Sequence, residues 1–177
     1  VKDDSNKYGV ISPDKSIILE TKYDDIKNIT GNDYYVVSEN GVLEIINGKG
    51  EVILNSGFET VEEINADYFI ITIGGKYGVI SKTGETKIEP KYDFLKNSFS
   101  NNYIAKLNGK TGIINEPSNQ IIGFSYENIS YIKEANFFKA ENADFTTDII
   151  DSSFNIVLNN IIVSELNIDN GYLRIRN

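Results

Sequence analysis

Carboxylates are the main groups in this chain that could perform acid–base chemistry. The 177 residues include 26 Asp and Glu but no His and no Cys, so the commonest general base and the thiol nucleophile are both missing. A pair of carboxylates is enough for glycoside hydrolysis when the two groups lie about 5 to 10 Å apart. Most acids recur with the repeat described below, and the clearest exceptions, Asp33, Glu63 and Glu134, share no predicted neighbourhood. We therefore expect no catalytic residues and no enzyme, with a carboxylate-based glycan-active enzyme as the second alternative function.

Metal and phosphate sites have no motif in the sequence either. Calcium loops place oxygen ligands at alternating positions around a glycine and end on a bidentate Glu. Neither NGKGE at 47–51 nor the pair Asp24-Asp25 belongs to such a loop. The pair Gly74-Gly75 before Lys76 predicts a hairpin turn, because no Lys-Ser/Thr step and no helix pattern follows it. The sequence predicts no metal and no cofactor.

The net charge of −9 restricts the partners. It repels a phosphate backbone, and the 17 basic residues are scattered, so we expect no nucleic-acid partner. The longest apolar runs, such as Tyr68–Ile71, are far shorter than the roughly 20 residues that cross a bilayer, so no membrane insertion is expected. Because the chain starts at Val1 and lacks Met, we expect a fragment excised from a longer chain, with an extracellular or cell-surface location favoured.

A unit of about 34 residues recurs five times along the chain, and the strands of this repeat must position the carboxylates and the turns described above. KYGVIS at 7–12 returns at 76–81, and two aromatic series share the period. One is an aromatic-acid step, found as Tyr23-Asp24, Phe58-Glu59, Tyr92-Asp93 and Tyr126-Glu127, with Ile162-Val163 as a degenerate fifth copy. The other consists of Tyr35, Phe69, Tyr103, Phe138 and Tyr172. We expect a single repeat domain over 1–177 with units at 7–40, 41–74, 75–108, 109–142 and 143–177.

Short apolar runs bounded by Gly, Asn, Asp and Ser predict four strands in each unit. The pairs Asn40-Gly41, Gly74-Gly75 and Asn108-Gly109 predict tight hairpins. The strand that contains the second aromatic, the strand after the hairpin turn and the strand that follows it should therefore form one antiparallel meander. The segment after the aromatic-acid step is a weaker strand. Since 34 residues cannot bury a hydrophobic face alone, the units must stack, and the step aromatics should pack between them rather than bind a ligand.

The segment KYGVISKTGETKIEPKYDFLKN at 76–97 resembles the bacterial WG repeat, which is named for a Trp-Gly step. Tyr8, Tyr77 and Thr111 stand at the Trp position, Gly9, Gly78 and Gly112 match the glycine, Gly84 matches the turn, and Pro90 matches the proline. The resemblance covers nearly the whole chain. It implies a non-catalytic repeat module in a tandem array of variable copy number, and it supplies no catalytic residues.

The expected fold is an all-β tandem repeat of five antiparallel β units in an open curved array, with a five-bladed β-propeller as the alternative. Val1–Asp4 align with Ile104–Leu107, which favours the open array. The expected function is a non-catalytic binding or interaction module of a larger bacterial protein, engaging a protein, peptide or glycan; a structural spacer or stalk is the first alternative. If loops bind, the hairpin tips at Ser12–Ser16, Asn47–Glu51 and Ser81–Gly84 are the expected sites.

Overall fold

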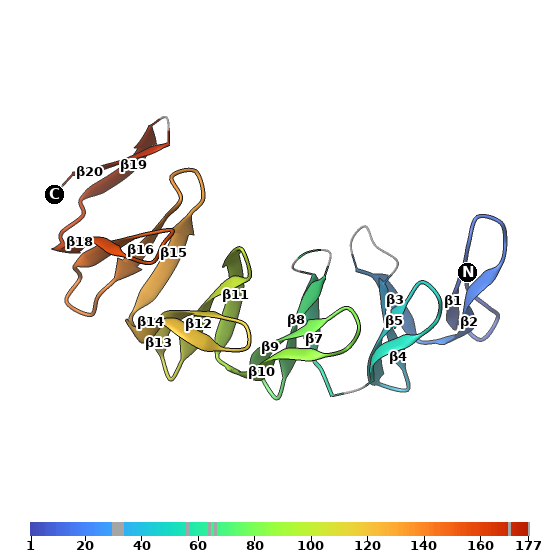
Figure 1. Ribbon diagram of the computed structural model, residues 1–177. Helices are drawn as coiled ribbons and strands as arrows, with labels where there is room; N and C mark the ends of the chain where they lie inside the picture. The colour runs from blue at the N-terminus through green and yellow to red at the C-terminus, as the bar shows by residue number, and fades with distance from the viewer. Residues whose placement is uncertain (30–33, 56, 64, 66, 170, 177) are drawn as a thin grey trace. The chain divides into compact units, whose positions relative to one another are not determined.

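The computed structural model describes residues 1–29, 34–55, 57–63, 65, 67–169 and 171–176 (Figure 1). Within these ranges every regular element is a β-strand, and no helix is present that could span a membrane. The chain divides into two compact units, unit 1 (Val1–Pro90) and unit 2 (Lys91–Asn177). The all-β tandem repeat predicted from the sequence is confirmed, whereas the open array, the five-bladed propeller and the unit boundaries stay predictions.

The strands form small antiparallel meanders, in which successive strands along the chain pair with each other. Four sheets have four strands each, β3–β6, β7–β10, β11–β14 and β15–β18, and the pairs β1–β2 and β19–β20 have two each. The first ten strands are β1 (Tyr8–Ile11), β2 (Ile17–Tyr23), β3 (Asp25–Asn28), β4 (Tyr34–Glu39), β5 (Val42–Asn47), β6 (Val52–Asn55), β7 (Thr60–Glu63), β8 (Tyr68–Ile73), β9 (Lys76–Ser81) and β10 (Thr86–Tyr92). The next ten are β11 (Phe94–Phe99), β12 (Asn102–Leu107), β13 (Lys110–Asn115), β14 (Asn119–Tyr126), β15 (Asn128–Ile132), β16 (Phe137–Glu141), β17 (Thr147–Asp151), β18 (Ile156–Ile161), β19 (Glu165–Asp169) and β20 (Tyr172–Arg176).

The predicted two-residue turns connect the two central strands of three sheets. Asn40 and Gly41 have φ of 52° and 79°, and Asn108 and Gly109 have φ of 52° and 80°. Such turns need positive φ at both central residues, which Asn and Gly adopt most easily. The segment after each aromatic-acid step forms the edge strand of its sheet, as β3, β7, β11 and β15. Each complete sheet therefore takes two strands from one sequence unit and two from the next.

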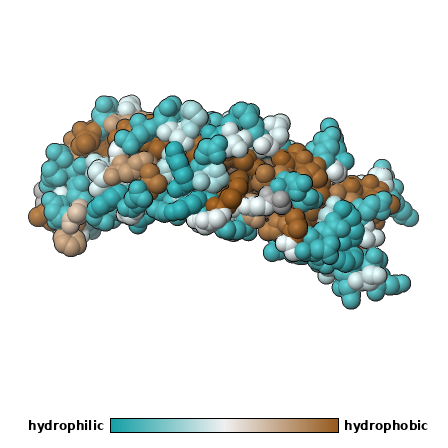
Figure 2. Space-filling model, turned by 90° about the horizontal axis from the view of Figure 1, so that it is seen from below, coloured by the Kyte–Doolittle hydropathy of each residue, from teal (hydrophilic) through white to brown (hydrophobic). Residues whose placement is uncertain are grey.

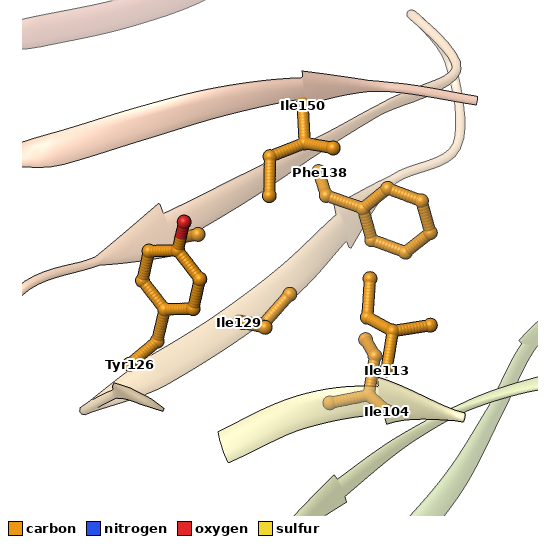
Figure 3. Close-up of a cluster of buried hydrophobic side chains, with 7 residues drawn as sticks. Ile104, Ile113, Tyr126, Ile129, Phe138 and Ile150 are labelled. Atoms are coloured by element: carbon orange, nitrogen blue, oxygen red, sulfur yellow. The ribbon is translucent and has the colours of Figure 1, made fainter. Parts of the chain in front are cut away.

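Within each unit, residues of one sheet pack against residues of the neighbouring sheet. In unit 1, Val37 and Ile46 of sheet β3–β6 pack with Leu19 and Tyr23 of the preceding pair, and Ile45 packs with residues of the following sheet. Unit 2 repeats this packing: Ile104 and Ile113 of one sheet meet the next core layer, which is formed by Tyr126, Ile129, Phe138, Ala140 and Ile150 (Figure 3). Two faces with period-two alternation thus bury nearly every Ile and Val of the inner strands.

The step aromatics belong to this core, as predicted. Tyr23, Phe58, Tyr92 and Tyr126 are 4%, 5%, 2% and 6% exposed. In unit 2, Tyr126 lies in the same cluster as Ile129 and Phe138, and in unit 1 Phe58 lies with Phe69 and Ile71. These four side chains are therefore buried and do not offer ring faces to a ligand.

The fifth copy of the repeat is displaced by one residue from its predicted position. The N–H of Glu127 donates to the carbonyl of Glu141, and the N–H of Ser164 donates in the same way to the carbonyl of Arg176. The fifth step is therefore Val163-Ser164, not Ile162-Val163. By the same register Leu173 replaces Tyr172 as the counterpart of Phe138, and Tyr172 is 78% exposed. Sequence spacing misplaced both because no aromatic-acid pair marks this copy.

Candidate functional site

In unit 1, the acids of two aromatic-acid steps, Asp24 and Glu59, accept hydrogen bonds from other residues of the fold. The Asp24 carboxylate accepts a hydrogen bond from the Lys7 ammonium at 2.6 Å and another from the Asn40 N–H at 2.7 Å. The first of these bonds, followed by the second, holds the pKa of Asp24 below its usual value. The Glu59 carboxylate accepts from the Gly75 N–H at 3.1 and 3.2 Å. Both carboxylates therefore stabilise the turn between the two central strands of a sheet, because they accept hydrogen bonds from its N–H groups.

Of the three acids that depart from the repeat, the structure describes the side chain of Glu134. Glu134 is exposed, next to the end of β15. Asp33 and the side chain of Glu63 lie outside the described residues. Among the residues that are described, no group of three or more His, Cys, Asp or Glu side chains could hold a metal ion. The absence of enzyme activity stays a prediction.

The predicted hairpin tips use their polar groups to close their own turns. Asn47 Oδ1 accepts from the N–H groups of Lys49 and Glu51 at 3.0 and 2.9 Å. Hydrogen bonds from the hydroxyls of Ser12 and Ser16 lower the pKa of Asp14 to about 2. Ser81 Oγ accepts from the N–H of Glu85 at 3.0 Å. A tip whose polar side chains satisfy its own backbone offers few groups to a ligand.

A groove of 620 Å³ lies elsewhere in unit 1, between sheet β3–β6 and the edge strand β7. We call it the β3–β7 groove. Its apolar lining consists of Ile29, Val36, Val37, Leu43, Phe58 and Val61. Its polar lining consists of Asp25, Lys27, Asn28, Ser38, Glu59, Thr60 and Glu62. Apolar residues also gather in patches among hydrophilic ones on the face drawn in Figure 2.

Two kinds of wall enclose the β3–β7 groove. On one side Asp25 pairs with Ser38, and Ser38 pairs with Leu43, so these three residues lie in a row across one sheet face. On the other side the lining includes the four consecutive residues 59–62. Three of them, residues 60–62, belong to β7, which is the last strand in the order of its sheet and pairs with β8. The β7 wall therefore belongs to an edge strand.

The groove carries a net negative charge. Asp25, Glu59 and Glu62 contribute carboxylates, and Lys27 contributes one ammonium group. The Lys27 Nζ lies 3.9 Å from Asp25 Oδ2, and both side chains are more than half exposed. An ion pair this long and this exposed contributes little, so Asp25 stays available to a cation from a partner.

Ser38 lines the groove at a position of the repeat where unit 2 has a larger residue. In unit 2 the register puts Lys106 opposite Phe94, where unit 1 has Ser38 opposite Asp25. The short serine leaves space that a lysine side chain would occupy. Sequence reasoning missed the groove, and the available signal was this exchange of a large side chain for a small one within the repeat.

A buried carboxylate in unit 2 also departs from the repeat. Asp148 pairs with Ala140, whereas the corresponding partner of Ala105 is Gly112. A Cβ at Gly112 would lie 2.6 Å from the Ile122 carbonyl oxygen. Asp148 is accommodated because its carboxylate accepts from the Asn160 N–H at 2.7 Å and from the Tyr126 hydroxyl at 2.8 Å. The carboxylate is therefore satisfied within the fold.

Tyr126 should make the stability of unit 2 depend on alkaline pH. Burial, together with the Asp148 carboxylate, raises the pKa of Tyr126 from 10.0 to about 12. Its contribution is complete below pH 10 and is lost as the pH rises towards 12, because the unfolded phenol ionises first. Tyr126→Phe should cost about 1–3 kcal/mol near neutral pH, because Asp148 loses a donor, and urea unfolding should show this cost shrinking above pH 10. The exposed Tyr172→Phe is the control, and a cost that stays constant with pH contradicts the assignment.

The fold and the site define a class of protein: an all-β tandem-repeat module with a groove of ligand size in unit 1. The chain belongs to the family described as WG containing repeat, whose model matches residues 8–42, 45–77 and 77–110, more than half of the chain. The resemblance inferred from KYGVIS and the Tyr-Asp steps is thereby confirmed.

Solved structures similar to this chain include the crystal structure of Kluyvelomyces marxianus Hsv2, with 8% sequence identity and a TM-score of 0.47 over 78% of this chain and 51% of that one. KlHsv2 with loop 6CD replaced by a Gly-Ser linker has 10% identity and a TM-score of 0.44, over 79% and 52%. The chain thus spans about half the length of these structures. No curated protein sequence matches it.

Proposed function

We propose that this chain is a non-catalytic binding module that holds a segment of a partner protein in the β3–β7 groove. The observation that carries the proposal is the groove itself, with an apolar floor, a polar rim and a volume of 620 Å³. Small-ligand and anchor sites have volumes of about 300–1,000 Å³ and a similar division between apolar lining and a few polar groups.

A peptide suits this groove better than a glycan. The aromatic ring in its lining is Phe58, which is 5% exposed and has no open face for a sugar ring. An apolar floor beside an edge strand is the combination that receives extended peptides. The stacked sheets on which the floor is built give it a fixed shape before the partner arrives, which reduces the entropy lost on binding.

Filling the groove should abolish binding without unfolding the chain. In Ser38→Lys a lysine takes the position that Lys106 occupies in unit 2, so the fold should tolerate it. We expect peptides selected from a displayed random library on the wild-type chain to bind Ser38→Lys at least tenfold more weakly, measured by calorimetry. The expected loss corresponds to about 1.4 kcal/mol or more.

The matched control is Lys106→Ser, which makes the reverse exchange at the corresponding position and should leave peptide binding unchanged. Thermal unfolding of both variants verifies that they fold. Selection that yields no peptide, or peptides that bind Ser38→Lys as well as the wild type, would overturn the proposal and favour a spacer. A glycan array probed with the same two variants tests the alternative ligand class.

A further inference from the structure

We infer that the partner segment is an extended strand that adds to the edge of β7 and carries apolar side chains at alternate positions together with lysine or arginine. This inference rests on the proposed function, since it names the chemistry of the ligand of the same groove. It commits to an occupant on two observations: the edge strand that forms one wall, and the sign of the charge on the rim.

The edge strand favours pairing through main-chain hydrogen bonds. In its sheet β7 pairs with β8, with Thr60 opposite Thr72 and Glu62 opposite Ile70. β7 is the last strand in the order β10-β9-β8-β7. Every second residue of such a strand turns its N–H and C=O away from the sheet. The Glu59 N–H already donates to the carbonyl of Thr72, so the groups offered to an incoming strand are those of alternate residues of β7.

The floor specifies side chains on one face of that strand. Ile29, Val36 and Leu43 line the groove from sheet β3–β6, and each is largely removed from solvent. Side chains at alternate positions of an extended segment share a face. A partner that pairs with β7 and turns apolar residues towards this floor buries area on both surfaces. A partner with polar residues at these positions would lose the hydration of those polar groups without gaining hydrogen bonds from the apolar floor.

The rim specifies the charge. Asp25 and Glu62 are exposed and border the groove from its two walls, and Lys27 alone opposes the three lining acids. The net charge of −9 on the whole chain adds a long-range attraction for a basic segment. Lysine or arginine beside the apolar positions is therefore favoured, and acidic segments are repelled on approach and at the rim.

The test uses the tightest peptide from the library selection, synthesised in two N-methylated forms. One form is methylated at odd-numbered amides and the other at even-numbered amides, so the two match in composition. Only one set of amides can point at β7, so one form should bind at least tenfold more weakly than the parent and the other should bind within about threefold of it. Equal affinities of the two forms would overturn strand addition.

The charge is tested with the double variant Asp25→Asn plus Glu62→Gln. Affinity for the parent peptide should fall at least fivefold at low salt, and the salt dependence of binding should weaken. Glu134→Gln, which removes an exposed acid from unit 2, should leave affinity unchanged. An unchanged affinity of the double variant, or acidic selected peptides, overturns the inference. If Ser38→Lys still weakens peptide binding in those cases, the proposed function stands. If no peptide is selected at all, the proposed function and this inference both fail.

Discussion

Phe138→Ala is expected to lower the free energy of unfolding of unit 2 by about 3–5 kcal/mol. Phe138 is fully buried in the core cluster with Ile104 and Ile150 (Figure 3). Its ring centroid lies 5.0 Å from that of Tyr131 and 5.8 Å from those of Phe99 and Phe154. Truncation would leave a cavity lined by side chains of two sheets that are held by their own backbone ladders, so the walls cannot close around it.

Urea denaturation followed by circular dichroism measures this loss. Phe145→Ala is the control, because Phe145 lies in the turn between β16 and β17 and is 93% exposed, and its effect should stay within about 0.5 kcal/mol. A cost below about 1 kcal/mol for Phe138→Ala would show that the two sheets do not pack through this residue. Equal costs for the two variants would likewise contradict the assignment of Phe138 to the core.

Gly84→Ala should destabilise unit 1 by about 2–5 kcal/mol, because two costs coincide. Gly84 has φ of +86°, where a non-glycine residue is strained by about 1–2 kcal/mol. An added Cβ would also lie 2.4 Å from the carbonyl oxygen of Ile53 in β6. A backbone atom cannot rotate away, so the turn or the strand must shift, at a cost of about 1–3 kcal/mol.

Gly41→Ala separates the two costs. Gly41 has φ of +79°, and a Cβ there would meet nothing within 4 Å. This variant should lose only the strain, about 1 kcal/mol. The difference between the midpoints of thermal unfolding of the two variants reports the close approach of the Gly84 turn to β6. If the two variants unfold at the same temperature, that close approach contributes nothing to stability.

Local signals were enough to predict the strands, the turns and the core residues. Asn40-Gly41 and Asn108-Gly109 encode their turns in their own φ preferences, and the continuous apolar runs in β8 and β12 mark residues that are buried on both faces of the sheet. The repeat then extends each assignment to the other copies. The prediction for the fifth copy was wrong because Val163-Ser164 keeps the backbone hydrogen bond of the aromatic-acid step but has neither the aromatic nor the acidic side chain.

The β3–β7 groove could not be predicted, because it depends on side chains that come from different sheets. Asp25, Ser38 and Leu43 meet across three strands, and residues 59–62, at the start of β7, line the same groove only after two sheets have stacked. No feature of their spacing distinguishes them from core or surface residues. The hairpin tips were the natural candidates from sequence, and the structure shows their polar groups closing their own turns instead.

The sequence by itself determined that this chain is an all-β repeat whose aromatic steps form the core, because hairpin turns and short apolar runs are local properties repeated with one period. Only the tertiary structure decided the roles of individual copies of a repeated residue. The step acids Asp24 and Glu59 accept hydrogen bonds from the turn residues Asn40 and Gly75, and Ser38, where unit 2 has Lys106, lines a groove. Those outcomes depend on the distance between neighbouring sheets and on the volume of the side chains between them, and neither quantity is encoded in the period.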